Sequence, residues 1–190
     1  MKKSMIKIII GLVMIATVVV GYLHEPENLI ELTCIANMLG GVLLFIDGIL
    51  NIIGKKKPIS NLYMNVCICI FMVLIVSFGG LSGIYKLNFK GAYFFLHVIN
   101  PITFITCYMF FCNDYKKKIR FVLTAPILMI IYLLFDYIQC QFTGKFVYGF
   151  VEPKDMSLFY ALITGIVIYI FTCLIACGLF GLNKLIHRKQ

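Results

Sequence analysis

The sequence predicts an all-α, polytopic membrane protein, a single bundle of six transmembrane helices formed by residues 1–190. The first observation is composition: 62% of the 190 residues are hydrophobic and only 13% are charged, as in multi-pass membrane proteins and unlike soluble domains. The second is the position of the charges, which fall in short segments between long apolar runs. The net charge of +9 therefore lies beside membrane helices, so we expect membrane lipids, and not nucleic acid, as partners.

Six apolar runs are each long enough to cross the hydrocarbon core, which takes about 20 helical residues. The first run follows a lysine-rich segment and ends without a small-x-small cleavage site, so we expect a retained helix and not a signal peptide. The expected spans are about residues 5–22, 29–53, 62–85, 92–112, 121–138 and 157–182.

The second span is the least apolar of the six. Its polar residues recur at spacings of three and four, which places them on one helical face that points away from lipid. Gly40 and Gly41 allow a neighbouring helix to approach closely, and we expect Asp47 and Asn51 to act in helix packing or loop anchoring. The residues of this face are Thr33, Asn37, Gly40, Leu44, Asp47 and Asn51.

The third and fifth spans place further polar or small residues near one end. The third ends with small residues that suit close helix packing, namely Ser77, Gly79, Gly80, Ser82 and Gly83. The fifth ends in YLLFDYIQC, which contains Asp136. The longest connection follows, at about 139–156, and its aromatic, glycine and proline residues predict an ordered interfacial loop.

The fourth span contains the only histidine within hydrophobic sequence, His97. Ionisable side chains at membrane depth are costly, face the protein interior or a wet cavity, and mark functional sites. Pro101 follows four residues later and lacks the N–H that would bond the His97 carbonyl, so we expect a kink there.

The distribution of Lys and Arg predicts the orientation in the membrane. With six spans, 13 of these residues fall on one side and four, Lys86, Lys90, Lys145 and Lys154, on the other. The basic side of a membrane protein faces the cytoplasm. We therefore expect both termini in the cytoplasm.

With this orientation, polar groups from four spans meet in the outer third of the membrane. Thr33 and His97 share a depth of roughly 6 to 9 Å, at about 1.5 Å per residue. A hydroxyl, an imidazole and a carboxylate at one level are the components of an activated nucleophile, its base and an orienting group. We therefore expect Thr33 as the nucleophile and His97 as the general base. The candidates for substrate binding or oxyanion stabilisation are Asn37, Ser77, Asn100 and Asp136.

Other interpretations of these residues stay open. Thr33 and His97 are also explained by structural hydrogen bonds within the bundle. A small transporter or proton-coupled permease would use Glu31, Asp47 and His97 as a relay, and a non-catalytic membrane scaffold would tolerate their substitution. We expect no metal or other cofactor, because the spans contain no second histidine and the eight cysteines lack a zinc-site pattern.

Several motifs resemble one family of membrane proteins. ELTCIANMLGG, residues 31–41, resembles the aromatic-Thr-x-x-(Ser/Thr)-Asn-Leu-Leu signature of small bacterial six-span proteins, and LHVINPI, residues 96–102, resembles their His-x-x-x-Pro segment. PILMIIYLLFDY and TGKFVYGF are similar to their Pro-x-x-x-Tyr span and Gly-x-x-Tyr-Pro-Tyr-x-Phe loop. These proteins are grouped with the androgen-induced protein and the androgen-dependent tissue-factor-pathway-inhibitor regulator of animals.

This resemblance implies an intramembrane hydrolase of fatty acid esters of hydroxy fatty acids, in a bacterial cell membrane. The animal members use a threonine and a histidine, which correspond to Thr33 and His97. The resemblance thus implies a lipid-ester substrate, with hydrolysis or acyl transfer as the reaction. The chain departs from the family pattern at Leu32, Ala36, Val147 and Gly149.

Overall fold

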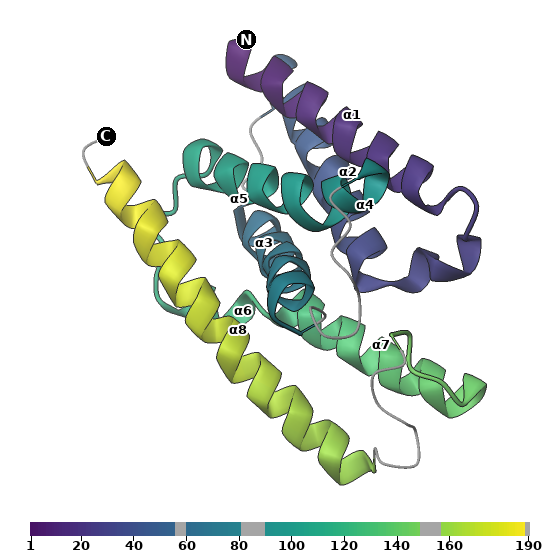
Figure 1. The fold of residues 1–190 in the computed structure, drawn as a ribbon. Coiled ribbons are helices and arrows are strands. Elements are labelled where there is room, and N and C mark those ends of the chain that lie inside the picture. Colours follow the sequence, from purple (N-terminus) through teal and green to yellow (C-terminus); the bar gives the residue numbers. More distant parts are fainter. Residues whose placement is uncertain (56–59, 81–89, 149–156, 189–190) are drawn as a thin grey trace.

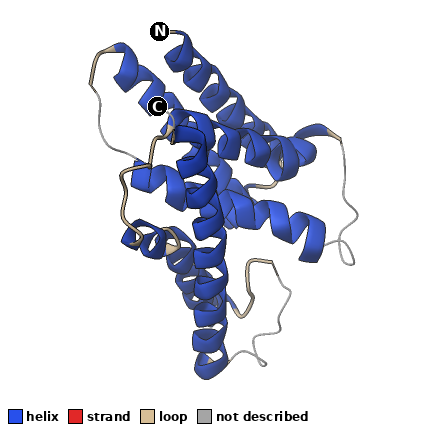
Figure 2. Ribbon diagram, turned by 90° about the vertical axis from the view of Figure 1, so that its left-hand side faces the viewer, coloured by secondary structure: helices blue, strands red, loops and turns tan. Residues whose placement is uncertain are grey.

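The computed structural model describes residues 1–55, 60–80, 90–148 and 157–188 (Figure 1). Every regular element in these residues is helical (Figure 2). Six helical segments are long and apolar enough to cross a membrane, which agrees with the predicted all-α, six-helix architecture. They are Lys2–Tyr22, Leu32–Ile52, Asn61–Gly79, Gly91–Phe111, Arg120–Thr143 and Leu158–His187.

The helix ends differ from prediction mainly in the last two segments, which reach Thr143 and His187 instead of residues 138 and 182. The outer end predicted for the third span, including Ser82 and Gly83, lies outside the described residues. In Figures 1 and 2 the first helix begins and the last helix ends toward the same end of the bundle.

The first two helices, α1 (Lys2–Tyr22) and α2 (Leu32–Ile52), pack closely because glycines face each other. A Cβ added to Gly11 would lie 2.6 Å from the Gly41 carbonyl oxygen, and one added to Gly48 would lie 2.8 Å from the Ser4 carbonyl oxygen. No larger side chain fits without separating the helices. The close approach predicted for Gly41 is therefore present, with α1 as the partner.

A second contact between these helices is polar. Lys7, only 8% exposed, forms an ion pair with Asp47, which also accepts a hydrogen bond from Tyr63 Oη at 2.9 Å. Asn51 Nδ2 donates to Asp47 Oδ1 at 3.0 Å. Asp47 therefore links α2 to α1 and to the helix that carries Tyr63, and Asn51 holds its carboxylate, consistent with the expected packing role. One of the lysines counted on the basic side is thus buried.

The centre of the bundle is formed by α3 (Ser60–Ile75), which continues into the π-helical turn η2 (Val76–Gly80), and by α5 (Asn100–Phe111). Tyr63, Phe104 and Tyr108 are almost fully buried there. Figure 1 shows α3 and α5 between α1 and α8.

The fourth segment is interrupted where the sequence predicts a kink. It consists of α4 (Gly91–Phe94), the π-helical turn η3 (Phe95–Ile99) and α5. Within it, Asn100 N donates to the Phe95 carbonyl five residues earlier. A wider turn accommodates the missing N–H of Pro101, so the distortion begins before His97 and includes it.

The last three helices diverge. Pro126 separates α6 (Arg120–Thr124) from α7 (Ile127–Thr143), so the fifth segment is broken near its start. The end of α8 (Leu158–His187) is fixed to α5, since Asn183 Nδ2 and His187 Nε2 donate to the carbonyls of Cys112 and Met109 at 2.9 and 3.0 Å. The opposite ends of α7 and α8 spread apart (Figure 1), and residues of both helices line a cavity.

Candidate functional site

Thr33 and His97, predicted to share a depth, are adjacent in the structure. The Oγ1 atom of Thr33 lies 3.5 Å from Nε2 of His97, and the Thr33 side chain is buried. Thr33 lies in the first turn of α2, and His97 lies in η3. The π-helical turn directs the imidazole toward α2, where a regular helix would rotate it differently.

The backbone around His97 defines its tautomer. His97 Nδ1 lies 2.9 Å from the carbonyl oxygen of Tyr93, which can only accept a hydrogen bond. Nδ1 therefore carries the hydrogen, and Nε2 presents its lone pair to Thr33. The ring is held further by stacking on Tyr93, with ring centroids 4.0 Å apart. The orienting group of this histidine is a carbonyl, and not the carboxylate expected from the sequence.

Two tyrosine hydroxyls accept hydrogen bonds from the first backbone N–H groups of α2, where Glu31 provides no side-chain cap. Leu32 N donates to Tyr132 Oη at 3.1 Å, and Thr33 N donates to Tyr148 Oη at 3.2 Å. The first N–H groups of a helix have no helical acceptor, so these hydroxyls replace the usual cap.

Tyr148 also reaches the nucleophile candidate. Its Oη atom lies 3.3 Å from Thr33 Oγ1. Burial raises the pKa of Tyr148 to about 12, so the phenol keeps its proton at neutral pH. Because the single hydroxyl hydrogen of Thr33 is directed at His97 Nε2, Thr33 Oγ1 accepts a hydrogen bond from the Tyr148 hydroxyl. The hydrogen bonds therefore run from Tyr148 through Thr33 to His97.

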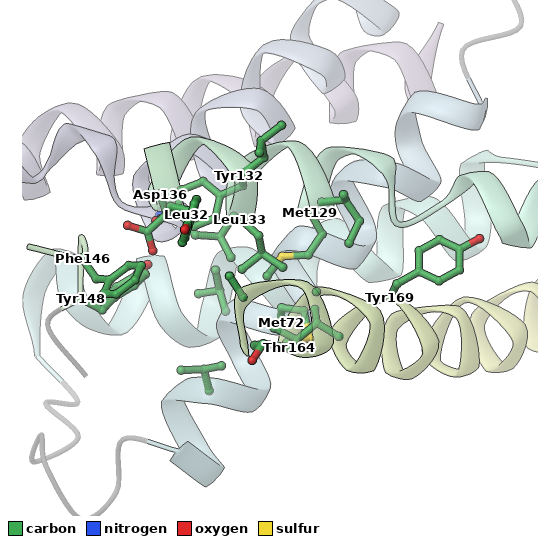
Figure 3. Close-up of a pocket in the computed structure, with 18 of the residues that line it drawn as sticks. Leu32, Met72, Met129, Tyr132, Leu133, Asp136, Phe146, Tyr148, Thr164 and Tyr169 are labelled. Atoms are coloured by element: carbon green, nitrogen blue, oxygen red, sulfur yellow. The ribbon is translucent and has the colours of Figure 1, made fainter. Parts of the chain in front are cut away.

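These groups lie at one end of an elongated cavity of about 640 Å³ (Figure 3). Its walls are apolar and come from α3, α7 and α8. Figure 3 shows Asp136, Phe146 and Tyr148 at one end and Tyr169 at the other. Thr33 and His97 also line the cavity and belong to the first end, because Thr33 contacts both His97 and Tyr148.

The four other predicted site residues have different environments. Ser77 lines the cavity, but its hydroxyl donates to the Val73 carbonyl at 2.7 Å. Asp136 also lines the cavity and accepts a hydrogen bond from Val147 N at 2.8 Å, which anchors the segment that carries Tyr148. Its position therefore indicates support of Tyr148 rather than contact with the oxyanion.

Asn37 and Asn100 do not line this cavity. Asn37 Nδ2 donates to the carbonyls of Thr33 and Leu96 at 2.8 and 3.0 Å, which uses both of its hydrogens. Asn100 Nδ2 donates to Thr17 Oγ1 at 2.9 Å and so joins α5 to α1. In this arrangement both amide hydrogens of Asn37 are used within the bundle, and Asn100 bonds away from the cavity, so the geometry does not support the predicted contacts of these two residues with an oxyanion or substrate.

The bond from Asn37 to Leu96 follows from the π-helical turn. Asn100 N, which would bond the Leu96 carbonyl in an α-helix, donates to Phe95 instead. The next residue, Pro101, has no N–H. The Leu96 carbonyl therefore lacks a helical donor, and Asn37 supplies one from α2, next to the Thr33 and His97 pair.

The contacts of Tyr148 and Tyr132 with α2 were not predicted from the sequence. Tyr148 belongs to the loop motif TGKFVYGF, whose Gly149 lies outside the described residues. One signal could have indicated these contacts. The start of α2 has no capping side chain of its own, so its first N–H groups need acceptors from other segments, and a tyrosine hydroxyl can serve as one.

In the described part of the chain, no three His, Cys, Asp or Glu side chains are grouped so as to hold a metal ion. Comparison of the chain with family models, curated proteins and solved structures gives no match. The class of protein defined by the fold is an integral, multi-pass membrane protein with six apolar helices.

Proposed function

We propose that the protein is an intramembrane lipid-ester hydrolase, or an acyl transferase, in which Thr33 is the nucleophile and His97 the general base. The observation that supports this most is the 3.5 Å approach of Thr33 Oγ1 to the imidazole nitrogen that carries no hydrogen in the neutral ring, at the polar end of an apolar cavity. Such contacts are often long before substrate binds and tighten in the complex.

The reaction follows from this arrangement. Thr33 Oγ1 attacks the ester carbonyl carbon while its proton moves to His97 Nε2. The tetrahedral intermediate then expels the alcohol, which takes the proton from His97, and leaves an acyl-threonine. Water, activated by the same nitrogen, releases the fatty acid and restores Thr33. An alcohol in place of water would give acyl transfer.

The negative charge on the former carbonyl oxygen develops next to Thr33. The Tyr148 hydroxyl, with Oη 3.3 Å from Thr33 Oγ1, can donate a hydrogen bond to this carbonyl oxygen. Thr33 N, which donates to Tyr148 Oη in the structure, becomes a second donor when Tyr148 turns toward the oxyanion. We assign oxyanion stabilisation to these two groups in place of Asn37.

The proposed orientation keeps both termini in the cytoplasm. It is supported by the distribution of Lys and Arg, 13 against four, and excluding the buried Lys7 leaves its direction unchanged. The Thr33 end of the cavity then faces the outer leaflet. The proposed location is a bacterial cell membrane, as the motif resemblance implies.

A proton relay through Glu31, Asp47 and His97 is less well supported. Asp47 pairs with Lys7, and Glu31 accepts from Tyr22 Oη at 2.7 Å. Asp47 is 14 positions from Thr33 along α2, or about 21 Å. Asp47 and Glu31 therefore have other partners, and Asp47 lies far from Glu31 and His97.

The test measures fatty acid release from a panel of lipid esters, including esters of hydroxy fatty acids, by the purified protein in detergent or nanodiscs. Thr33→Ala and His97→Ala should each abolish release. Thr106→Ala and His24→Ala are matched controls, since both residues are exposed and lie outside the cavity. They should retain wild-type rates.

Near-UV circular dichroism and size-exclusion elution establish that each variant is folded. Release that persists in folded Thr33→Ala would exclude Thr33 as the nucleophile, and release that persists in His97→Ala would exclude His97 as the base. A wild-type protein that cleaves no ester would favour the non-catalytic interpretation.

A further inference from the structure

The cavity is much larger than its polar end requires. Its α8 wall extends from Leu158 to Tyr169, eleven positions and about 16 Å along the helix. Beyond the polar end it is lined by aliphatic, methionine and aromatic side chains, among them Met72, Met129 and Leu133 (Figure 3). This shape suits one extended hydrocarbon chain with its polar group beside Thr33.

The length of the cavity sets the length of that chain. An extended chain covers about 3.8 Å per three bonds, so about 16 Å corresponds to roughly 12 to 13 carbon–carbon bonds, or a chain of about 13 carbons. Tyr169 lies at the far end, and its hydroxyl donates to the Leu123 carbonyl at 3.0 Å, which holds the ring in place. Tyr169 therefore marks the far end of the cavity lining.

Gly165 lies between the two ends. It lines the cavity, and a Cβ added to it would meet no atom within 4 Å. It precedes the fully buried Thr172 by seven positions, or about two turns, so it lies on the face of α8 that points into the bundle. A side chain at this position would enter the cavity without a clash.

We propose that the cavity holds a single acyl chain of about 13 carbons that extends from Thr33 to Tyr169, and that the absence of a side chain at Gly165 sets the accepted chain length. The identification of this chain as part of the substrate rests on the proposed function, whereas its binding does not. A side chain at Gly165 should block the cavity about 10 Å from Leu158, which leaves room for roughly eight carbons.

The test measures the binding of saturated fatty acids of about 6 to 18 carbons to the purified protein, by displacement of a fluorescent fatty acid. A Thr33→Ala background excludes turnover. In the parent, affinity should increase with length up to about 13 carbons and then stop increasing. With Gly165→Leu added, the maximum should move to about eight carbons, and affinity for the 14-carbon acid should fall at least about tenfold.

Gly181→Leu is the matched control. Gly181 belongs to the same helix, has no atom within 4 Å of an added Cβ and is exposed. It lies about 160° around the helix from Gly165, at 100° per residue. Gly165→Ala adds only one methyl group, and it should move the maximum in the same direction by less, so the test does not depend on the folding of Gly165→Leu.

An unchanged length profile in both Gly165 variants, an equal shift in Gly181→Leu, or no binding of any fatty acid would overturn the proposal. Hydrolysis of p-nitrophenyl esters of the same acids by the wild-type protein tests the proposed hydrolase function independently of the chain-length proposal. Shifted binding without ester cleavage would refute the hydrolase alone. Ester cleavage without a shift would refute the chain-length role of Gly165 alone.

Discussion

His97 Nδ1 lies 2.9 Å from the carbonyl oxygen of Tyr93, four residues earlier in the chain. A carbonyl cannot donate, so this contact leaves Nε2 as the basic nitrogen, and Nε2 is the atom that faces Thr33. The base is thus oriented by the backbone of its own distorted helix.

The first prediction concerns this tautomer. In ¹⁵N spectra of histidine-labelled protein at neutral pH, His97 should show a protonated Nδ1 and an unprotonated Nε2, because the Tyr93 carbonyl selects that form. The signal that disappears in His97→Ala assigns the residue among the three histidines. A protonated Nε2 would contradict the proposed role of His97 as base.

The second prediction concerns Tyr148. Tyr148→Phe removes the hydroxyl 3.3 Å from Thr33 Oγ1 and keeps the ring. Loss of one oxyanion donor should lower kcat by about 10²- to 10³-fold, with a much smaller change in KM. Steady-state kinetics on a cleaved ester measure both. Tyr160→Phe, at an exposed position outside the cavity, should change neither.

If Tyr148→Phe instead raised KM and left kcat unchanged, Tyr148 would bind the substrate and not the transition state. Because Tyr148 also accepts from Thr33 N, a thermal unfolding curve in detergent should accompany the kinetics. It separates lost stability from lost catalysis.

The third prediction concerns the bond from Asn37 to the Leu96 carbonyl. Asn37→Ala leaves this buried acceptor without a donor and should lower the free energy of unfolding by about 1 to 3 kcal/mol. Pro101→Ala restores an N–H five residues after Leu96, where a π-helical bond can form. The loss caused by Asn37→Ala should therefore be smaller in the Pro101→Ala background.

A double-mutant cycle with thermal or denaturant unfolding measures this coupling. Additive effects of the two substitutions would show that Asn37 does not compensate for the missing N–H of Pro101. Asn28→Ala, at a partly exposed position in the turn before α2, is the control.

The fourth prediction concerns pH. Burial raises the pKa of Glu31, which precedes α2, above its ordinary value of 4.5, although the hydrogen bond from Tyr22 acts in the opposite direction. The folded protein therefore binds this proton more tightly than the unfolded chain. The resulting stabilisation is fully present below pH 4.5 and is lost as pH increases through the folded pKa.

Glu31→Gln keeps an acceptor for Tyr22 and does not titrate, so its Tm should decline less than that of the wild type as pH increases above 4.5. Differential scanning fluorimetry with a thiol-reactive dye suits this chain, which has eight cysteines and no tryptophan. Glu27→Gln, at an exposed position in the same segment, should follow the wild type. Parallel curves for wild type and Glu31→Gln would refute the assignment.

Most of the architecture could be predicted from the sequence. Six apolar runs, separated by charged segments, predict six helices, because a helix satisfies its backbone polar groups within one segment. Two local features could also be predicted, because each depends on the sequence of one helix. They are the face of α2 that carries Thr33 and Asn37, and the distortion near Pro101. The pairing of Thr33 with His97 was predicted from equal depth, whereas in the structure Thr33 is the second residue of its helical segment and His97 the seventh of its own.

Only the tertiary structure decided which polar groups meet. The partners of α2 come from residues far away in the chain: Tyr132, Tyr148 and Leu96 contact Leu32, Thr33 and Asn37, respectively. Lys7 contributes to a buried ion pair, and not only to the basic side of the chain. Spacing along one helix specifies a face but not its neighbour, so the rotation and spreading of helices determine the contacts between them.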